Sequence, residues 1–138
     1  MNNSMVFSYA ARLRKMGNDY ILSELGNAGL MDIVPSHGEI LLYLLEAGTL
    51  RMGELTRKVR RTKSTVTVLV AKLAHGGYVE RRPDPADSRS TLVSLTEKGQ
   101  SLRPAFEVIS DGLDNMLRQR LSDGELAELS SLLKKAVS

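Results

Sequence analysis

Along most of the chain, apolar residues recur every three or four positions, the spacing that places them on one face of an α-helix. This pattern predicts a long helix over residues 3–25, short helices over 36–47 and 53–60, and a helix over 63–75. Two more helices are predicted to begin after Thr96 and Ser122. Between the fourth and fifth helices, Tyr78–Arg82 and Ser90–Leu95 are rich in strand-forming residues and predict a β-hairpin, with the Pro- and Asp-rich residues 83–89 as a seven-residue tip.

Polar side chains with capping chemistry mark several of these helix ends. Ser36-x-x-Glu39 and Ser122-x-x-Glu125 are expected to form capping boxes, in which each side chain binds a free backbone N–H. Thr62 is expected to be the N-cap of the fourth helix, and Thr96 that of the fifth. Pro104 lies early in the fifth helix and predicts either a kink or a late start. Glycines are expected to end three helices, namely Gly26 with Gly29, Gly48, and Gly76 with Gly77.

The helix over residues 63–75 has an unusual outward face. One stripe is apolar and predicted to be buried, with Val66, Leu69, Val70 and Leu73. At 100° per residue, small or polar side chains occupy the opposite face and its flanks, namely Ser64, Thr65, Thr67, Val68, Ala71 and Lys72. No bulky apolar group on that face needs cover, so the helix is suited to enter a groove.

The charge of the chain is concentrated in its middle. Residues 51–90 hold ten basic and four acidic side chains, a net charge of +6, whereas the remaining residues carry nine basic and twelve acidic groups. Five of the seven residues from Arg57 to Lys63 are basic and lead into the N-terminus of the fourth helix. This segregation suits either a face that meets a polyanion or a solvated surface rich in Lys and Arg.

Length and composition limit the remaining classes of protein. A chain of 138 residues is the common size of one domain. No apolar run approaches the ~20 residues of a membrane span, and no secretory pattern opens the chain. The absence of cysteine excludes disulfides and thiol chemistry and favours a cytoplasmic location. No metal site, cofactor motif or catalytic constellation is visible, so an enzyme is not expected.

The order of elements, with short helices, a helix with a polar outer face and a basic hairpin, predicts a mainly α fold built on a winged helix-turn-helix. A single helix fits the major groove of B-DNA, which is about 12 Å wide. Double-stranded DNA is therefore the expected partner. A winged-helix module that binds another protein within a larger complex is the alternative.

The sequence resembles the MarR family of regulators over nearly its whole length. The resemblance is carried by Gly53-Glu-Leu55, Lys63-Ser-Thr-Val-Thr67, Gly77-Tyr-Val-Glu-Arg81, Asp84-Pro-Ala-Asp-Ser-Arg89 and Leu95-Thr-Glu-Lys-Gly99. It implies a homodimeric regulator, usually a repressor, that binds a pseudo-palindromic operator. It also implies one domain over 1–138, with dimerisation helices over 1–30 and 100–138 and a DNA-binding lobe over 34–96.

The resemblance assigns roles to individual residues. Arg89 enters the minor groove, and Asp87 holds the wing arginines by charge pairing. The expected DNA-binding residues are Arg60, Arg61, Lys63, Ser64, Thr65, Thr67, Val68, Lys72, Arg81, Arg82, Asp87, Ser88 and Arg89. Many relatives carry a polar or basic residue where this chain has Val68, which suits a thymine methyl instead.

A small amphipathic or aromatic effector is a further expectation from the resemblance. Its cleft would lie between the dimerisation and DNA-binding lobes and be lined by Tyr9, Tyr20, His37 and Tyr43, each of which also fits a core position. His37 also fits a capping or packing role, and His75 fits a cation at the C-terminus of a helix. The lack of cysteine excludes the peroxide-sensing branch of the family, and two histidines argue against its zinc-sensing branch.

Overall fold

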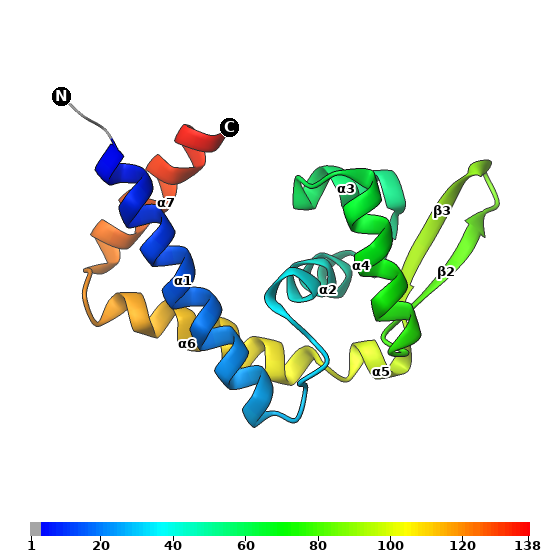
Figure 1. Ribbon diagram of the computed structural model, residues 1–138, viewed down its shortest axis with the longest axis horizontal. Helices are drawn as coiled ribbons and strands as arrows, with labels where there is room; N and C mark the ends of the chain where they lie inside the picture. Colours follow the sequence, from blue (N-terminus) through cyan, green and yellow to red (C-terminus); the bar gives the residue numbers. More distant parts are fainter. Residues whose placement is uncertain (1–3) are drawn as a thin grey trace. The chain divides into compact units, whose positions relative to one another are not determined.

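The computed structural model of the protein describes residues 4–138, whose helices and strands are drawn in Figure 1. They are α1 (Ser4–Asn27), α2 (Pro35–Ala47), β1 (Thr49–Arg51), α3 (Met52–Val59), α4 (Lys63–His75), β2 (Val79–Asp84), β3 (Asp87–Leu95), α5 (Glu97–Gln100), α6 (Arg103–Arg118) and α7 (Asp123–Val137). The chain divides into two compact units, one ending at Phe106 and the other spanning Glu107–Ser138. The predominance of helix with one small sheet confirms the predicted fold class.

The first helix extends slightly further than its pattern predicts. α1 continues past Gly26 to Asn27, and the chain turns at Gly29, whose φ of 75° is free of strain only for glycine. Position 3, the predicted start, lies outside the described residues. Leu25 at the end of the helix is buried, whereas apolar side chains near its beginning are exposed, namely Met5, Val6, Phe7 and Tyr9.

The predicted capping box at the start of the second helix is wrong. α2 begins at Pro35, and its N-cap is Val34, which makes no side-chain hydrogen bond. Proline suits the first helical position because its φ is already helical and the N–H that it lacks would have no partner in the helix. Ser36 therefore lies within the first turn. The predicted end is confirmed, since Gly48 has a φ of 82° and donates to the Leu44 carbonyl at 2.7 Å.

Helices α2, α3 and α4 contact one another around an apolar core. The buried side chains are Ile40, Leu41, Leu44 and Leu45 of α2, Leu55 and Val59 of α3, and Val66, Val70 and Leu73 of α4. The predicted stripe of α4 is thereby confirmed at three of its four positions, and Leu69 is half-buried. The packing leaves the opposite face of α4 outside the core.

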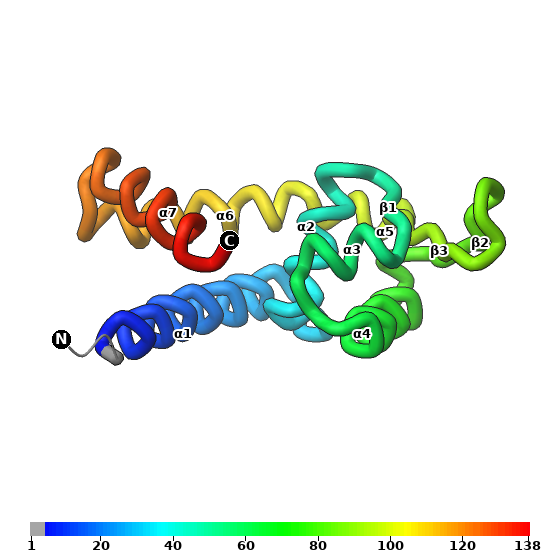
Figure 2. The backbone as a smooth tube through the Cα atoms, turned by 90° about the horizontal axis from the view of Figure 1, so that it is seen from above, coloured from blue at the N-terminus to red at the C-terminus, as the bar shows by residue number. Residues whose placement is uncertain are grey.

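A three-stranded antiparallel sheet in the order β1-β3-β2 covers one end of this core. The pairing of β1 with β3 adds a third strand to the predicted hairpin. In Figures 1 and 2, β2 and β3 project outward from the helices with their turn at the free end. This hairpin is the wing of the winged helix-turn-helix.

The predicted seven-residue tip is wrong, because both strands extend into it. β2 continues through Pro83 to Asp84, β3 begins at Asp87, and the turn comprises two residues. Proline is tolerated at this point because β2 is an edge strand. The register then slips, since Pro83 faces Thr91 while Asp84 faces Asp87. Residues 88–90 of β3 therefore form a bulge without partners in β2.

The fifth predicted helix is interrupted near its start. Thr96 caps α5 by accepting from the Gly99 amide at 3.1 Å, as predicted. The helix ends at Gln100 and a new one, α6, begins at Arg103 with Pro104 in its first turn. Of the two readings of Pro104, the late start is the correct one.

The unit over residues 107–138 contains most of α6 and the whole of α7. The capping box at its second helix is confirmed, because Ser122 and Glu125 exchange backbone-to-side-chain hydrogen bonds of 2.9 and 3.2 Å. These bonds also lower the pKa of Glu125. No side chain of α7 is buried, although its sequence carries a leucine stripe, and Leu132, Leu133 and Val137 are exposed.

Candidate nucleic-acid interface

The N-terminus of α4 is held by a cluster of hydroxyl groups. Thr62 accepts from the Thr65 amide at 3.2 Å, which confirms it as the N-cap, and its hydroxyl donates to Thr65 Oγ1 at 2.9 Å. Ser64 Oγ lies 3.2 Å from the same Thr62 oxygen. The amide ends and dipole of this helix favour a phosphate in front of it. The small polar side chains of Thr62, Ser64 and Thr65 therefore lie at the end of the helix where a phosphate would bind.

The outward face of α4, which is predicted to contact bases and is called its reading face below, points away from the core. Ser64, Thr65, Thr67 and Val68 are exposed, with Val68 at 55%. The Thr67 hydroxyl donates to the Lys63 carbonyl at 2.8 Å, which leaves its acceptor lone pairs for an outside donor. This face thus offers hydroxyls and one aliphatic surface, the groups that contact base edges and thymine methyls in a major groove.

Basic side chains surround this face. Arg60, Lys63 and Lys72 are exposed, and Arg61 is half-buried in the short link between α3 and α4. Arg60 has a φ of 53°, a left-handed conformation that ends α3 and turns the chain sharply into α4. The tight turn keeps this basic segment close to the N-terminus of α4.

The wing carries the remaining predicted residues. Arg81, Arg82 and Ser88 are exposed, and Arg82 lies 3.9 Å from Glu80. Arg89 is placed in the bulge of β3 and not at the turn, with a side chain that is 91% exposed. Its backbone amide and its Nε both donate to Asp87 Oδ1, at 3.0 and 3.4 Å. Asp87 therefore orients the Arg89 side chain locally.

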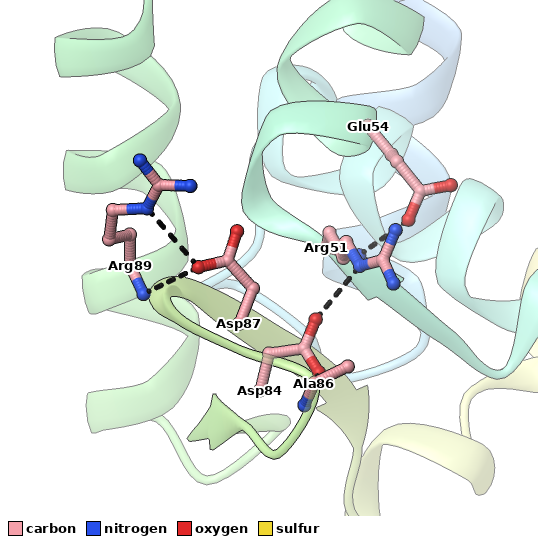
Figure 3. A network of polar contacts seen from close by, with 6 residues as sticks. All are labelled: Arg51, Glu54, Asp84, Ala86, Asp87 and Arg89. Atoms are coloured by element: carbon pink, nitrogen blue, oxygen red, sulfur yellow. Dashed lines mark hydrogen bonds and ion pairs between the residues drawn. The ribbon is translucent and has the colours of Figure 1, made fainter.

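A second carboxylate, Asp84, fixes the turn of the wing together with Arg51 (Figure 3). Asp84 is buried, with Oδ1 accepting from the Ala86 amide and Oδ2 accepting from Arg51 Nε, both at 2.9 Å. These two bonds lower the pKa of Asp84, the Ala86 amide more than Arg51, and the same pairing raises the pKa of Arg51. The Arg51 amide also donates to Glu54 of α3 at 3.1 Å. An aspartate that bonds the amide two residues on is a turn signal readable from Asp-Pro-Ala, whereas the arginine partner is not readable.

The C-terminal end of α4 is held from the opposite side. Tyr78 is buried and donates to the Asp32 carboxylate, with oxygen–oxygen distances of 2.9 and 3.0 Å. Burial and this carboxylate raise the pKa of Tyr78 to about 12. Lys98 Nζ lies 4.4 Å from the centre of the Tyr78 ring and donates to the carbonyl of Gly76, the C-cap of α4, at 2.6 Å. Both ends of α4 are thus fixed, the first by Thr62 as predicted and the second by contacts of Tyr78 and Lys98 that no sequence motif indicated.

The four predicted effector residues lie in different surroundings. Tyr9 is exposed with Arg12 5.8 Å from its ring centre, Tyr20 is half-buried, and Tyr43 has Lys58 at 5.6 Å. His37 is buried in the first turn of α2, and both ring nitrogens lack a hydrogen-bond partner within residues 4–138. Burial and the charge of Lys72 lower its pKa, against a smaller opposing effect of Asp32. Its packing role is consistent with this burial, while a capping role is not.

Neither metal ligands nor a membrane span stand out in the described part of the chain. Among residues 4–138, no three His, Asp or Glu side chains gather closely enough to hold a metal ion. Over the same residues, every helix is too short or too polar to cross a bilayer.

Several known proteins are similar to this chain in sequence and in fold. The sequence model of the MarR family matches residues 31–90, which include α2 to α4 and most of the wing. The HTH-type transcriptional regulator YcgE of Bacillus subtilis is 31% identical over 124 residues, covering 89% of this chain and 80% of YcgE. Similar solved structures include mutant MarR from E. coli with operator DNA (TM-score 0.86, 24% identity, 96% of this chain and 94% of that one). The S. aureus MepR–DNA complex is also similar (TM-score 0.79, 26% identity, 99% and 97%).

Proposed function

The chain belongs to the MarR family of transcriptional regulators, and we propose that it acts as a homodimeric repressor that binds a pseudo-palindromic operator. The observation that carries this proposal is the exposed polar face of α4, which is flanked by basic residues and accompanied by a basic wing in the same unit. This combination fits a helix in the major groove and a hairpin over the adjacent backbone.

In the proposed complex, α4 reads bases and the surrounding charges hold the backbone. Ser64, Thr65 and Thr67 contact base edges or nearby phosphates, and Val68 packs against a thymine methyl. Arg89 enters the minor groove, where the negative potential is concentrated. The phosphate-binding residues are Arg60, Arg61, Lys63, Lys72, Arg81 and Arg82, with Asp87 and Ser88 supporting the wing.

The proposed dimer is supported by apolar surface at both ends of the chain. α7 buries none of its side chains, and α1 exposes Met5, Val6 and Phe7. Exposed apolar surface of this kind commonly marks a protein interface. We propose that residues 1–30 and 100–138 form the dimerisation part of one domain spanning 1–138. Two-fold symmetry would then present two α4 helices to two half-sites.

Release by a small amphipathic or aromatic effector completes the proposal. Among the four candidates, His37 supports this effector proposal most. Its buried imidazole has no hydrogen-bond partner in residues 4–138, and the charge of Lys72 on α4 contributes to lowering its pKa. A ligand that reaches His37 would therefore act close to the DNA-reading helix. We propose that the regulator works in the cytoplasm.

Selection of bound fragments from the source genome tests the proposal. The purified protein should retain fragments that share a sequence with two half-sites, whose centres lie about 10 bp apart or a multiple of that spacing. Retention of no specific fragment would contradict the proposal and favour a winged-helix module that binds protein.

Arg89→Ala should weaken operator binding about 100-fold or more, because each protomer of the proposed dimer loses a charge-assisted hydrogen bond that supplies roughly 1.5–3 kcal/mol. Arg89 is expected to matter because its side chain is 91% exposed and is oriented by Asp87, so its guanidinium is accessible to DNA. Fluorescence anisotropy with a labelled operator measures the effect. Arg120→Ala, the same change of charge at an exposed site in residues 107–138, should bind as the wild type does. Equal losses in both variants would show a non-specific charge effect.

A further inference from the structure

One ion pair links the two outer strands of the sheet. Leu92 of β3 faces Arg51 of β1 on one side and Arg82 of β2 on the other. The Arg51 side chain extends from β1 to Asp84, two residues beyond Arg82 along β2, where Nε and Oδ2 are 2.9 Å apart. Arg51 thus reaches across the central strand to the turn of the wing (Figure 3). Asp84 is only 5% exposed at its side chain, so the pair fixes a carboxylate inside the hairpin.

The turn between β2 and β3 determines where the segment that carries Arg89 starts. The other oxygen of Asp84 accepts from the Ala86 amide and closes the two-residue turn. The strand that follows is not tied to β2 over residues 88–90, because the register slips between Pro83 and Asp84. Ladder hydrogen bonds to β2 therefore cannot fix the bulge that contains Arg89. Its position depends on the turn on one side and on the Thr91 pairing on the other.

Arg51 also contacts α3, the helix that precedes α4. Its amide donates to Glu54 Oε1 at 3.1 Å, and Glu54 is the third residue of α3. α3 in turn packs against α4 and is joined to it by a short turn. Arg51 therefore connects the turn of the wing with the helix pair that carries the reading face.

We propose that Arg51 is a positioning residue for DNA recognition, which sets the place of Arg89 relative to α4 through Asp84. The inference rests on the proposed function, since it assumes that Arg89 contacts the minor groove. It assigns Arg51 no contact with DNA of its own. Arg51 is half-exposed, with 54% of its side chain accessible, so a direct phosphate contact is the rival explanation that the test must separate.

A double-mutant cycle on operator affinity separates positioning from direct contact. Arg51→Met should weaken binding about fivefold to tenfold, within the loss caused by Arg89→Ala. The double variant should bind no more weakly than Arg89→Ala alone, because Arg51 acts through Arg89. Losses that multiply in the double variant would overturn the proposal in favour of an independent phosphate contact. Wild-type affinity in Arg51→Met would overturn it as well, as would an unchanged affinity in Arg89→Ala.

Two further variants make the cycle specific. Arg51→Lys keeps a cation near Asp84 and should recover part of the affinity. Arg120→Met removes one positive charge from an exposed side chain in the link between α6 and α7 and should bind within twofold of the wild type. If the wild type itself retains no operator, the proposed function fails. If the wild type and Arg120→Met bind while Arg51→Met is unaffected, only the positioning role fails.

Amide hydrogen exchange provides a readout that is independent of DNA. The Ala86 amide, which donates to Asp84, should exchange several times faster in Arg51→Met than in the wild type, while core amides of α2 keep their protection. This pattern would also show that the variant is folded. Unchanged exchange at Ala86 would contradict the proposal, because the turn would then be fixed without Arg51.

Discussion

Raising the salt concentration from about 50 to 200 mM should weaken operator binding by a factor of roughly 1,000 or more, as for proteins that neutralise at least six phosphates. The structure supplies the charges for this effect. Within residues 57–89 all basic side chains except half-buried Arg61 are exposed, and a dimer would present two such sets. Counterion release then dominates the affinity, because each neutralised phosphate frees bound cations from the duplex.

Anisotropy titrations at several potassium chloride concentrations measure this dependence, and two variants divide it by mechanism. Lys63→Ala should reduce the slope of log affinity against log salt by about two, since it removes one phosphate contact from each protomer of the proposed dimer. Val68→Ala should keep the slope and change the preferred base pair, because a methyl contact carries sequence information but no charge. A slope near zero in the wild type would be incompatible with a DNA-binding function for the basic lobe.

Local signals were sufficient to predict most of the helices. Thr62, Thr96 and Ser122 each bond an amide of the first helical turn that follows them, so their positions define helix starts without any tertiary contact. The predicted box at Ser36 failed for an equally local reason. Pro35 occupies the first position of α2 and moves the N-cap to Val34, whose side chain cannot accept a hydrogen bond.

The wing was harder to predict, because its geometry depends on distant partners. The composition of residues 83–89 indicates a turn, but not that Pro83 pairs with Thr91 at a sheet edge. The contact between Arg51 and Asp84 joins positions that are 33 residues apart. It requires β1 to pair with β3, and a three-residue strand has too little pattern of its own to reveal that pairing. The resemblance named the candidate DNA-contacting residues and Asp87, whereas the contacts of Asp84 with Arg51 and of Lys98 with Gly76 were visible only in the fold.

Gly99→Ala should lower the free energy of unfolding by about 3 kcal/mol, at the upper end of the range for an added core methylene. Gly99 lies buried in α5, and a Cβ there would overlap the carbonyl oxygen of Tyr78 and lie 2.9 Å from Leu95 Cδ2. The Tyr78 carbonyl accepts from the Thr96 amide and cannot move freely. Helix propensity favours alanine by only about 1 kcal/mol, so the steric effect should prevail.

Urea unfolding followed by circular dichroism measures this change, with Gly124→Ala as the matched control. Gly124 also lies near the start of a helix, but its nearest atom is Ser122 Oγ at 4.0 Å. Its substitution should leave stability unchanged or raise it by up to about 1 kcal/mol. Because Tyr78 and Lys98 hold the C-terminal end of α4, Gly99→Ala should also weaken operator binding where the protein remains folded. Equal stability of both variants would show that α5 separates from Tyr78 at no cost, and α4 would then need another support.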